Sequence, residues 1–79
     1  LRYFLATARE ENFTHAAEQL HVTQPTLSRQ IADFEEKLGV KLFTRSNHSI
    51  ILTEDGRFLK RRAQEILNLA EKTKQDFLT

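Results

Sequence analysis

The stretch FTHAAEQLHVTQPTLSRQIADFEEKLGVKLF, residues 13–43, decides the fold. Its Thr23-Gln24-Pro25 is typical of a helix start, because Thr23 or Gln24 can cap the first turn and Pro25 lacks only an N–H that the turn does not use. Apolar residues then recur at spacings of four, three and four: Leu27, Ile31, Phe34 and Leu38. This spacing predicts a helix over 24–38 with one buried face, ended by Gly39 in left-handed conformation.

Two shorter helices are expected before this one. The first covers residues 1–11, in which four apolar residues form one helical stripe: Leu1, Phe4, Leu5 and Ala8. Thr14 can cap a second helix, which turns Ala17 and Leu20 inward and ends near residues 21–22. The tight link at residues 21–23 between two helices predicts a helix-turn-helix pair.

The helical period is lost over residues 40–53. Two short runs rich in β-forming residues flank a polar turn at residues 46–49, which predicts a small hairpin. Thr53 can then cap a last helix, in which Gly56 is expected to carry only a mild penalty. The predicted fold is mainly α: a winged helix-turn-helix with a three-helix core and a β-hairpin wing over residues 1–53, followed by a long linker or dimerisation helix over residues 54–79.

The last helix carries a repeat at spacings of four and three. Its members are Leu59, Ala63, Ile66, Ala70, Thr73 and Phe77. Such a repeat favours pairing with a second copy of the chain, so a homodimer is expected. The alternative is a helix that packs only on its own domain. The basic residues Arg57, Lys60, Arg61 and Arg62 flank the repeat, and we interpret them as a solvated face, with a phosphate-binding cluster as the alternative.

Composition excludes several classes of protein. The 79 residues carry a net charge of +1 and no cysteine, so disulfides and thiolate metal sites are excluded. His15, His21 and His48 lack the spacing of a metal site, and no catalytic constellation or cofactor motif is present. The longest apolar run, residues 50–52, is far too short to span a membrane, and no leader is seen. Because the chain begins at Leu1, we interpret it as part of a longer protein.

The outward face of the 24–38 helix indicates a function. Pro25, Arg29 and Ala32 lie opposite the apolar face, Thr26 and Ser28 lie on its flanks, and Gln24 can reach forward from the cap. Arginine, glutamine, serine and threonine are side chains that read base edges in the major groove. Asp33, Glu35 and Glu36 follow, so only the N-terminal half should approach phosphates. The alternative is an ordinary amphipathic helix with a solvated polar face.

Residues 13–31, together with residues 38–45 and Leu52-Thr53-Glu54-Asp55-Gly56, resemble the N-terminal domain of LysR-type transcriptional regulators over nearly the whole chain. The resemblance implies a bacterial cytoplasmic regulator that binds double-stranded DNA, with a small-molecule effector bound only by a domain outside this chain. In the family, positions matching Gln24, Pro25, Thr26, Ser28 and Arg29 approach bases.

Three further residues are candidates for contact with DNA outside the reading helix. Arg45 matches a usual family arginine and is predicted to contact a phosphate. Thr14 could bind a phosphate through its hydroxyl and the helix amides, or act only as a cap. His48 stands where the family has a wing arginine, which puts a strong minor-groove contact in doubt, so it is either a DNA contact or a plain turn residue.

Two functions from different classes therefore remain open. The first is a sequence-specific, dimeric DNA-binding domain. The second is a winged-helix and coiled-coil module that binds protein, which the low net charge permits. An enzyme is not expected.

Overall fold

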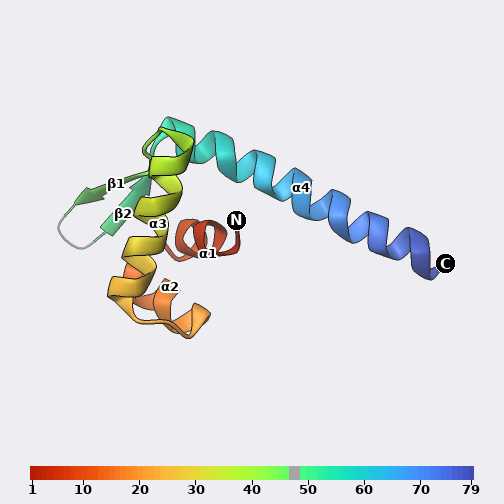
Figure 1. Ribbon diagram of the computed structural model, residues 1–79, viewed down its shortest axis with the longest axis horizontal. Helices are drawn as coiled ribbons and strands as arrows, with labels where there is room; N and C mark the ends of the chain where they lie inside the picture. Colours follow the sequence, from red (N-terminus) through yellow and green to blue (C-terminus); the bar gives the residue numbers. More distant parts are fainter. Residues whose placement is uncertain (47–48) are drawn as a thin grey trace.

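The computed structural model describes residues 1–46 and 49–79. Its elements in chain order are α1 (Arg2–Glu10), α2 (Phe13–Leu20), α3 (Gln24–Leu38), β1 (Phe43–Ser46), β2 (Ser49–Leu52) and α4 (Glu54–Leu78). The three short helices pack together beside the hairpin, and α4 leaves this body as a long arm (Figure 1). The predicted mainly helical winged helix-turn-helix is confirmed.

Local signals explain where the helices begin and end. The Thr23 and Thr53 side chains accept hydrogen bonds from the amides of Thr26 and Gly56 and so cap α3 and α4, as predicted. Gly39 ends α3 with a φ of 75°, also as predicted.

The predicted cap of the second helix is wrong. Asn12, not Thr14, is the N-cap of α2, and its side chain accepts a hydrogen bond from the His15 amide. Asparagine and threonine are both good caps, but the helix already includes Phe13, which places Thr14 inside the first turn.

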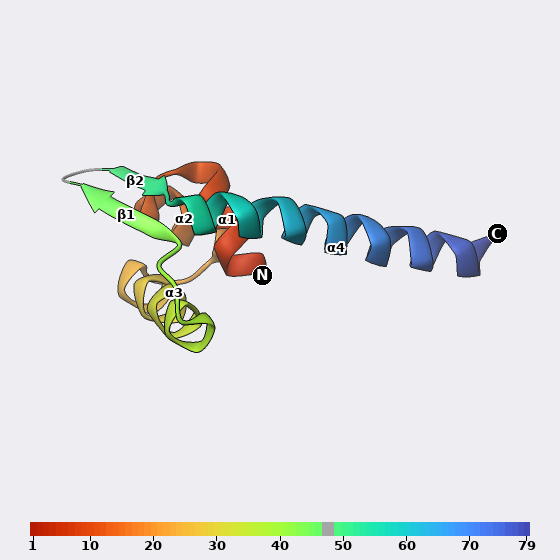
Figure 2. The ribbon, with the colours of Figure 1, turned by 90° about the horizontal axis from the view of Figure 1, so that it is seen from above.

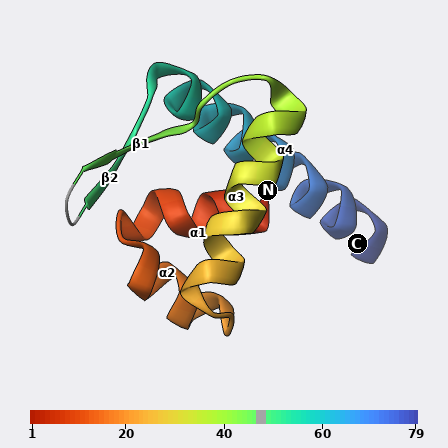
Figure 3. The same ribbon diagram turned by 60° about the vertical axis from the view of Figure 1, so that its left-hand side comes forward.

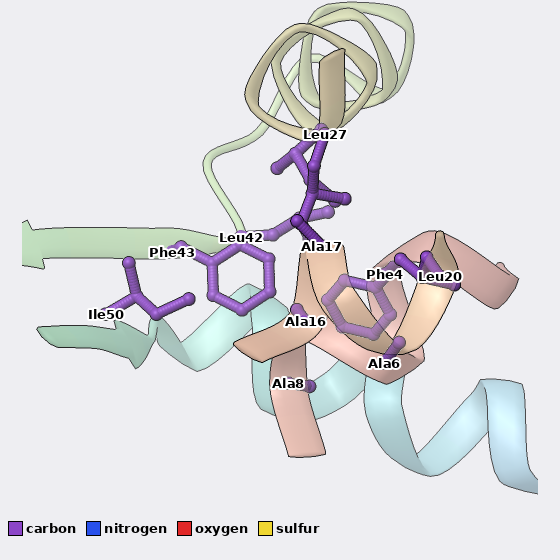
Figure 4. Packing of buried hydrophobic residues seen from close by; sticks show 11 residues of the cluster. Phe4, Ala6, Ala8, Ala16, Ala17, Leu20, Leu27, Leu42, Phe43 and Ile50 are labelled. Carbon is purple, nitrogen blue, oxygen red and sulfur yellow. The ribbon is translucent and has the colours of Figure 1, made fainter. Parts of the chain in front are cut away.

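One core joins α1, α2, α3 and the hairpin. Phe4 lies at its centre, with its ring centroid 5.5 Å from that of Phe43 and 6.5 Å from that of Phe34. Leu27 from α3 and Leu42 before β1 close the core around it (Figure 4). Because these contacts link four elements, they hold α3 at a defined place on the body.

The predicted apolar faces extend further than the core does. Leu38 at the end of α3 is 47% exposed, so the expectation that it lies on a buried face is wrong. Leu1, at the start of the predicted stripe, is also exposed. Glu35, in contrast, is buried although it is an acid. Its carboxylate accepts hydrogen bonds from the amides of Leu42 and Phe43, at 2.7 and 3.3 Å. The end of α3 is therefore joined to the hairpin by a polar contact.

The hairpin pairs β1 and β2 antiparallel, from Phe43 opposite Leu52 to Ser46 opposite Ser49. Its base is fastened to α4 through Thr53, whose hydroxyl donates to the Lys41 carbonyl at 2.6 Å and whose amide donates to that of Leu42 at 2.9 Å. Gly56 lies buried against Leu42, where a Cβ would overlap the Leu42 carbonyl oxygen, so it is required by close packing and is not a mild penalty.

The first turns of α4 belong with the body. Gly56 and Ala63 are buried and Leu59 packs against the core. Every residue from 64 onward is exposed, and we call this exposed part of α4 the arm. The predicted boundary between residues 53 and 54 stays a prediction. Within the described ranges 1–46 and 49–79, no helix combines the length and hydropathy that a bilayer crossing needs.

Candidate nucleic-acid interface

The N-terminal half of α3 presents the residues expected to read bases. Gln24, Pro25 and Arg29 are exposed, and Thr26 and Ser28 are half-buried. Ala32 continues the exposed row, and the opposite side of the helix is buried. The outward orientation predicted for this face is confirmed. Its role in reading bases stays a prediction.

The first turn of α3 is held by its cap. The Thr23 hydroxyl donates to the Thr26 hydroxyl oxygen at 2.8 Å and accepts from the Thr26 amide at 3.3 Å. Pro25 has no N–H and the Thr26 amide donates to Thr23, so the Gln24 amide is one that these contacts leave without an acceptor. Few amides at the start of α3 are therefore left to bind a phosphate.

The charges on α3 are divided along the helix. Residues 24–32 contain one arginine and no acid, while Asp33 and Glu36 are exposed beyond them. Glu35, expected among the solvated acids, is turned into the body. A DNA backbone, with its negative charge, would be repelled by the second half of the helix and not by the first.

Arg45 of β1 lies against both helices of the pair. Its Nη2 donates to the Ser28 hydroxyl oxygen at 3.1 Å, and its guanidinium carbon lies 4.6 Å from the centroid of the Phe13 ring. The sequence predicted only a phosphate contact for Arg45. No sequence signal pointed to these contacts, because the partners are 17 and 32 positions away and meet only through the fold.

Thr14 is exposed in the first turn of α2. Asn12 accepts from the His15 and Ala16 amides, through its side chain and its carbonyl respectively. The amides of Phe13 and Thr14 have no such acceptor among the described residues. These N–H groups and the Thr14 hydroxyl are suited to an anion, although Thr14 is not the cap.

The predicted wing contact, His48, lies outside the described residues. On the described part of the hairpin, Thr44, Arg45 and Ile51 are exposed. The hairpin and α3 lie at the same end of the molecule, and α4 runs toward the other end (Figure 2). The residues predicted to read bases and the described strands of the hairpin therefore lie at one end of the molecule.

The six residues predicted for dimerisation divide into two groups. Leu59 is half-buried and Ala63 is fully buried within this chain, so Ala63 has no surface left for a partner. Ile66, Ala70, Thr73 and Phe77 are exposed along the arm. The last turns of α4 extend beyond the body (Figure 3), and these exposed apolar residues are not covered by any described residue of the chain.

The described residues hold no group of three histidine, cysteine, aspartate or glutamate side chains placed to bind a metal ion. The chemistry available at this end of the molecule is hydrogen bonding by amide, hydroxyl and guanidinium groups.

The chain is similar in sequence to proteins of known family. The chain is 49% identical over 70 residues to a probable cat1 operon transcriptional activator of Acinetobacter lwoffii, covering 89% of this chain and 23% of that protein. It is 47% identical over 74 residues to the Hca operon transcriptional activator HcaR of Escherichia coli K12, covering 94% of this chain and 25% of that protein. The chain thus spans about a quarter of these relatives' length.

Two solved structures have the same fold. One is a complex of the CbnR DNA-binding domain with DNA, at a TM-score of 0.86 and 40% identity, covering 94% of this chain and 85% of that one. The other is a complex of the BenM DNA-binding domain with benA site 1 DNA, at a TM-score of 0.86 and 38% identity, covering 94% and 86%.

A family model for bacterial regulatory helix-turn-helix proteins of the lysR family matches residues 1–57, which include the helix pair, the wing and the start of α4. The chain therefore belongs to the LysR family of bacterial regulatory helix-turn-helix proteins.

Proposed function

We propose that this chain binds double-stranded DNA sequence-specifically in transcription regulation, with α3 in the major groove. The observation that carries the proposal is the exposed, acid-free N-terminal half of α3, which offers amide, hydroxyl and guanidinium groups in one row. The solved DNA complexes of similar domains support the same reading.

The proposed contacts fall into two classes. Gln24, Thr26, Ser28 and Arg29 read base edges, with Pro25 packed beside them, and Arg29 has the geometry to bind guanine O6 and N7 together. Thr14, Arg45 and His48 are the proposed contacts to the DNA backbone. Backbone contacts set position and affinity, while the α3 row sets sequence preference.

We further propose that the chain forms a homodimer through the exposed arm of α4. Ile66, Ala70, Thr73 and Phe77 are the members of the repeat that remain available to a second copy. A two-fold dimer would present two copies of α3 to two half-sites, so the preferred DNA should be close to palindromic.

The remainder of the relatives' length is where an effector domain would lie. We propose that a small-molecule effector acts only through such a domain and that the protein works in the cytoplasm, where its DNA is. The chain itself is proposed to use no cofactor.

Binding-site selection from random DNA, followed by titration at two salt concentrations, tests the proposal. A DNA reader should prefer a defined site, and its affinity should fall steeply with salt. Arg29→Ala should lose about 1–3 kcal/mol on the selected site and relax preference at one base pair, while binding to random DNA is retained. Arg9→Ala is a matched control, because Arg9 is exposed on α1 and lines a groove toward α4 that no α3 residue lines.

Absence of DNA binding even at low salt would instead favour the protein-binding module. Equal losses by Arg29→Ala on selected and random DNA would contradict the base-reading role of α3.

A further inference from the structure

Arg45 is a side chain that joins the wing to both helices of the pair. It comes from β1, its guanidinium lies over Phe13 of α2, and its Nη2 reaches Ser28 of α3. Phe13 and Ser28 are half-buried, so both contacts lie at the edge of the body. No carboxylate pairs with Arg45 among the ion pairs of the described residues, so its donors are not engaged in a salt bridge.

The contact determines what the Ser28 hydroxyl can do. An arginine nitrogen can only donate, so the Ser28 oxygen must accept and its hydrogen is left for another partner. Hydroxyls inside helices often return that hydrogen to the carbonyl four residues earlier, as Thr7 does to Tyr3 at 2.8 Å. Ser28 donates no hydrogen bond to the described residues. Its hydrogen is therefore available to an external acceptor.

We propose that Arg45 is a positioning residue for base reading, which holds Ser28 of α3 as a hydrogen-bond donor to an acceptor on a base edge. The acceptors of this class in the major groove are guanine O6 and N7, adenine N7 and thymine O4. This inference rests on the proposed function and goes beyond it, because it makes a residue of the wing strand determine the sequence preference of α3.

A double-mutant cycle on DNA discrimination tests the coupling. Ser28→Ala first identifies the base pair at which Ser28 affects preference. The quantity measured is then the affinity for the selected site divided by the affinity for the same site with that base pair substituted. Arg45→Met, which keeps the length of the side chain but not its donors, should lower this ratio roughly tenfold in the wild-type chain. In the Ser28→Ala chain it should lower the ratio less than about twofold.

Thr26 supplies the matched control. It lies in the same row, and its hydroxyl accepts from Thr23 and not from Arg45. Arg45→Met should therefore have its full effect in a Thr26→Ala chain. Arg45→Lys, which keeps the charge but loses the planar guanidinium, should preserve salt-dependent affinity better than it preserves the discrimination ratio.

A residue that acts only on phosphate would weaken all DNA sequences equally and lower the salt slope by about one. That result, or an equal effect of Arg45→Met with and without Ser28, overturns the inference and leaves the proposed function intact. NMR of the free chain is an independent measurement: the Arg45 side-chain protons should be shifted upfield by the Phe13 ring and should lose that shift in Phe13→Leu. Absence of the shift overturns the inference whether or not the wild-type chain binds DNA, whereas a wild-type chain that fails to bind refutes the proposed function.

Discussion

Phe4 and Phe77 are the same side chain in two regions of the molecule that treat it in opposite ways. Phe4 is 1% exposed at the centre of the body, and Phe77 is 85% exposed near the end of α4. Both stand in helices with apolar residues at helical spacing. The difference shows that such spacing locates an apolar stripe without saying what covers it, since the body covers its own stripes and no described residue covers that of the arm.

The largest effect we expect separates these two phenylalanines. Phe4→Ala should lower the free energy of unfolding by about 3–5 kcal/mol, because it leaves a cavity against Phe34 and Phe43. Phe77→Ala should change it by less than about 0.5 kcal/mol in dilute, monomeric protein. Urea unfolding measures both values. Similar losses for the two variants would show that the arm packs on the body.

The elements of the body could be predicted because their signals are local. Thr23, Gly39 and Thr53 mark helix ends through contacts within a few residues of the chain. The choice of Asn12 over Thr14 could not be made this way, because both residues suit a cap and only the packing of Phe13 separates them.

What could not be predicted depends on residues far apart in sequence. Glu35 was predicted to be a solvated acid. The amides of Leu42 and Phe43, which donate hydrogen bonds to its carboxylate, come close to it only after the chain turns at Gly39. The exposed row predicted to read bases could be placed on the helix from periodicity, yet the contact of Arg45 with Ser28 depends on how the hairpin folds back. The spacing of apolar residues thus placed the candidate site on α3, whereas the tertiary structure determines which contacts orient its side chains.

The second prediction concerns the joint between body and arm. Gly56→Ala should lower the free energy of unfolding by about 3 kcal/mol, because its Cβ would meet the Leu42 backbone and lie 2.8 Å from Leu52 Cδ2. Gly39→Ala should lower it by about 1 kcal/mol, because the φ of 75° is unfavourable for alanine although nothing lies within 4 Å. Thermal unfolding compares the two. The reverse order would mean that the first turn of α4 is not seated against the hairpin.

A smaller effect is expected where polar groups hold the body together. Glu35→Gln keeps the shape of the side chain but loses its charge, so its bonds to two amides should weaken by about 1–2 kcal/mol. Glu36→Gln is the control, since Glu36 is exposed and should change stability by less than about 0.5 kcal/mol. Equal stabilities of the two variants in urea would show that the Glu35 bonds contribute nothing net.

The smallest effect on folding is expected for substitutions in the arm, which instead test whether the arm forms the dimer. Ile66 is 52% exposed, so Ile66→Lys should leave the unfolding of the dilute chain unchanged within about 0.5 kcal/mol. It should nevertheless raise the dissociation constant of the dimer in sedimentation equilibrium, because a lysine would be desolvated at the contact. Asn68→Lys adds the same charge two residues along, on a different side of α4, and should leave the dimer intact. If both substitutions acted alike, net charge would explain the loss. If Ile66→Lys destabilised the monomer instead, the arm would pack on the body. The exposure of Phe77 would then not be typical of the whole arm.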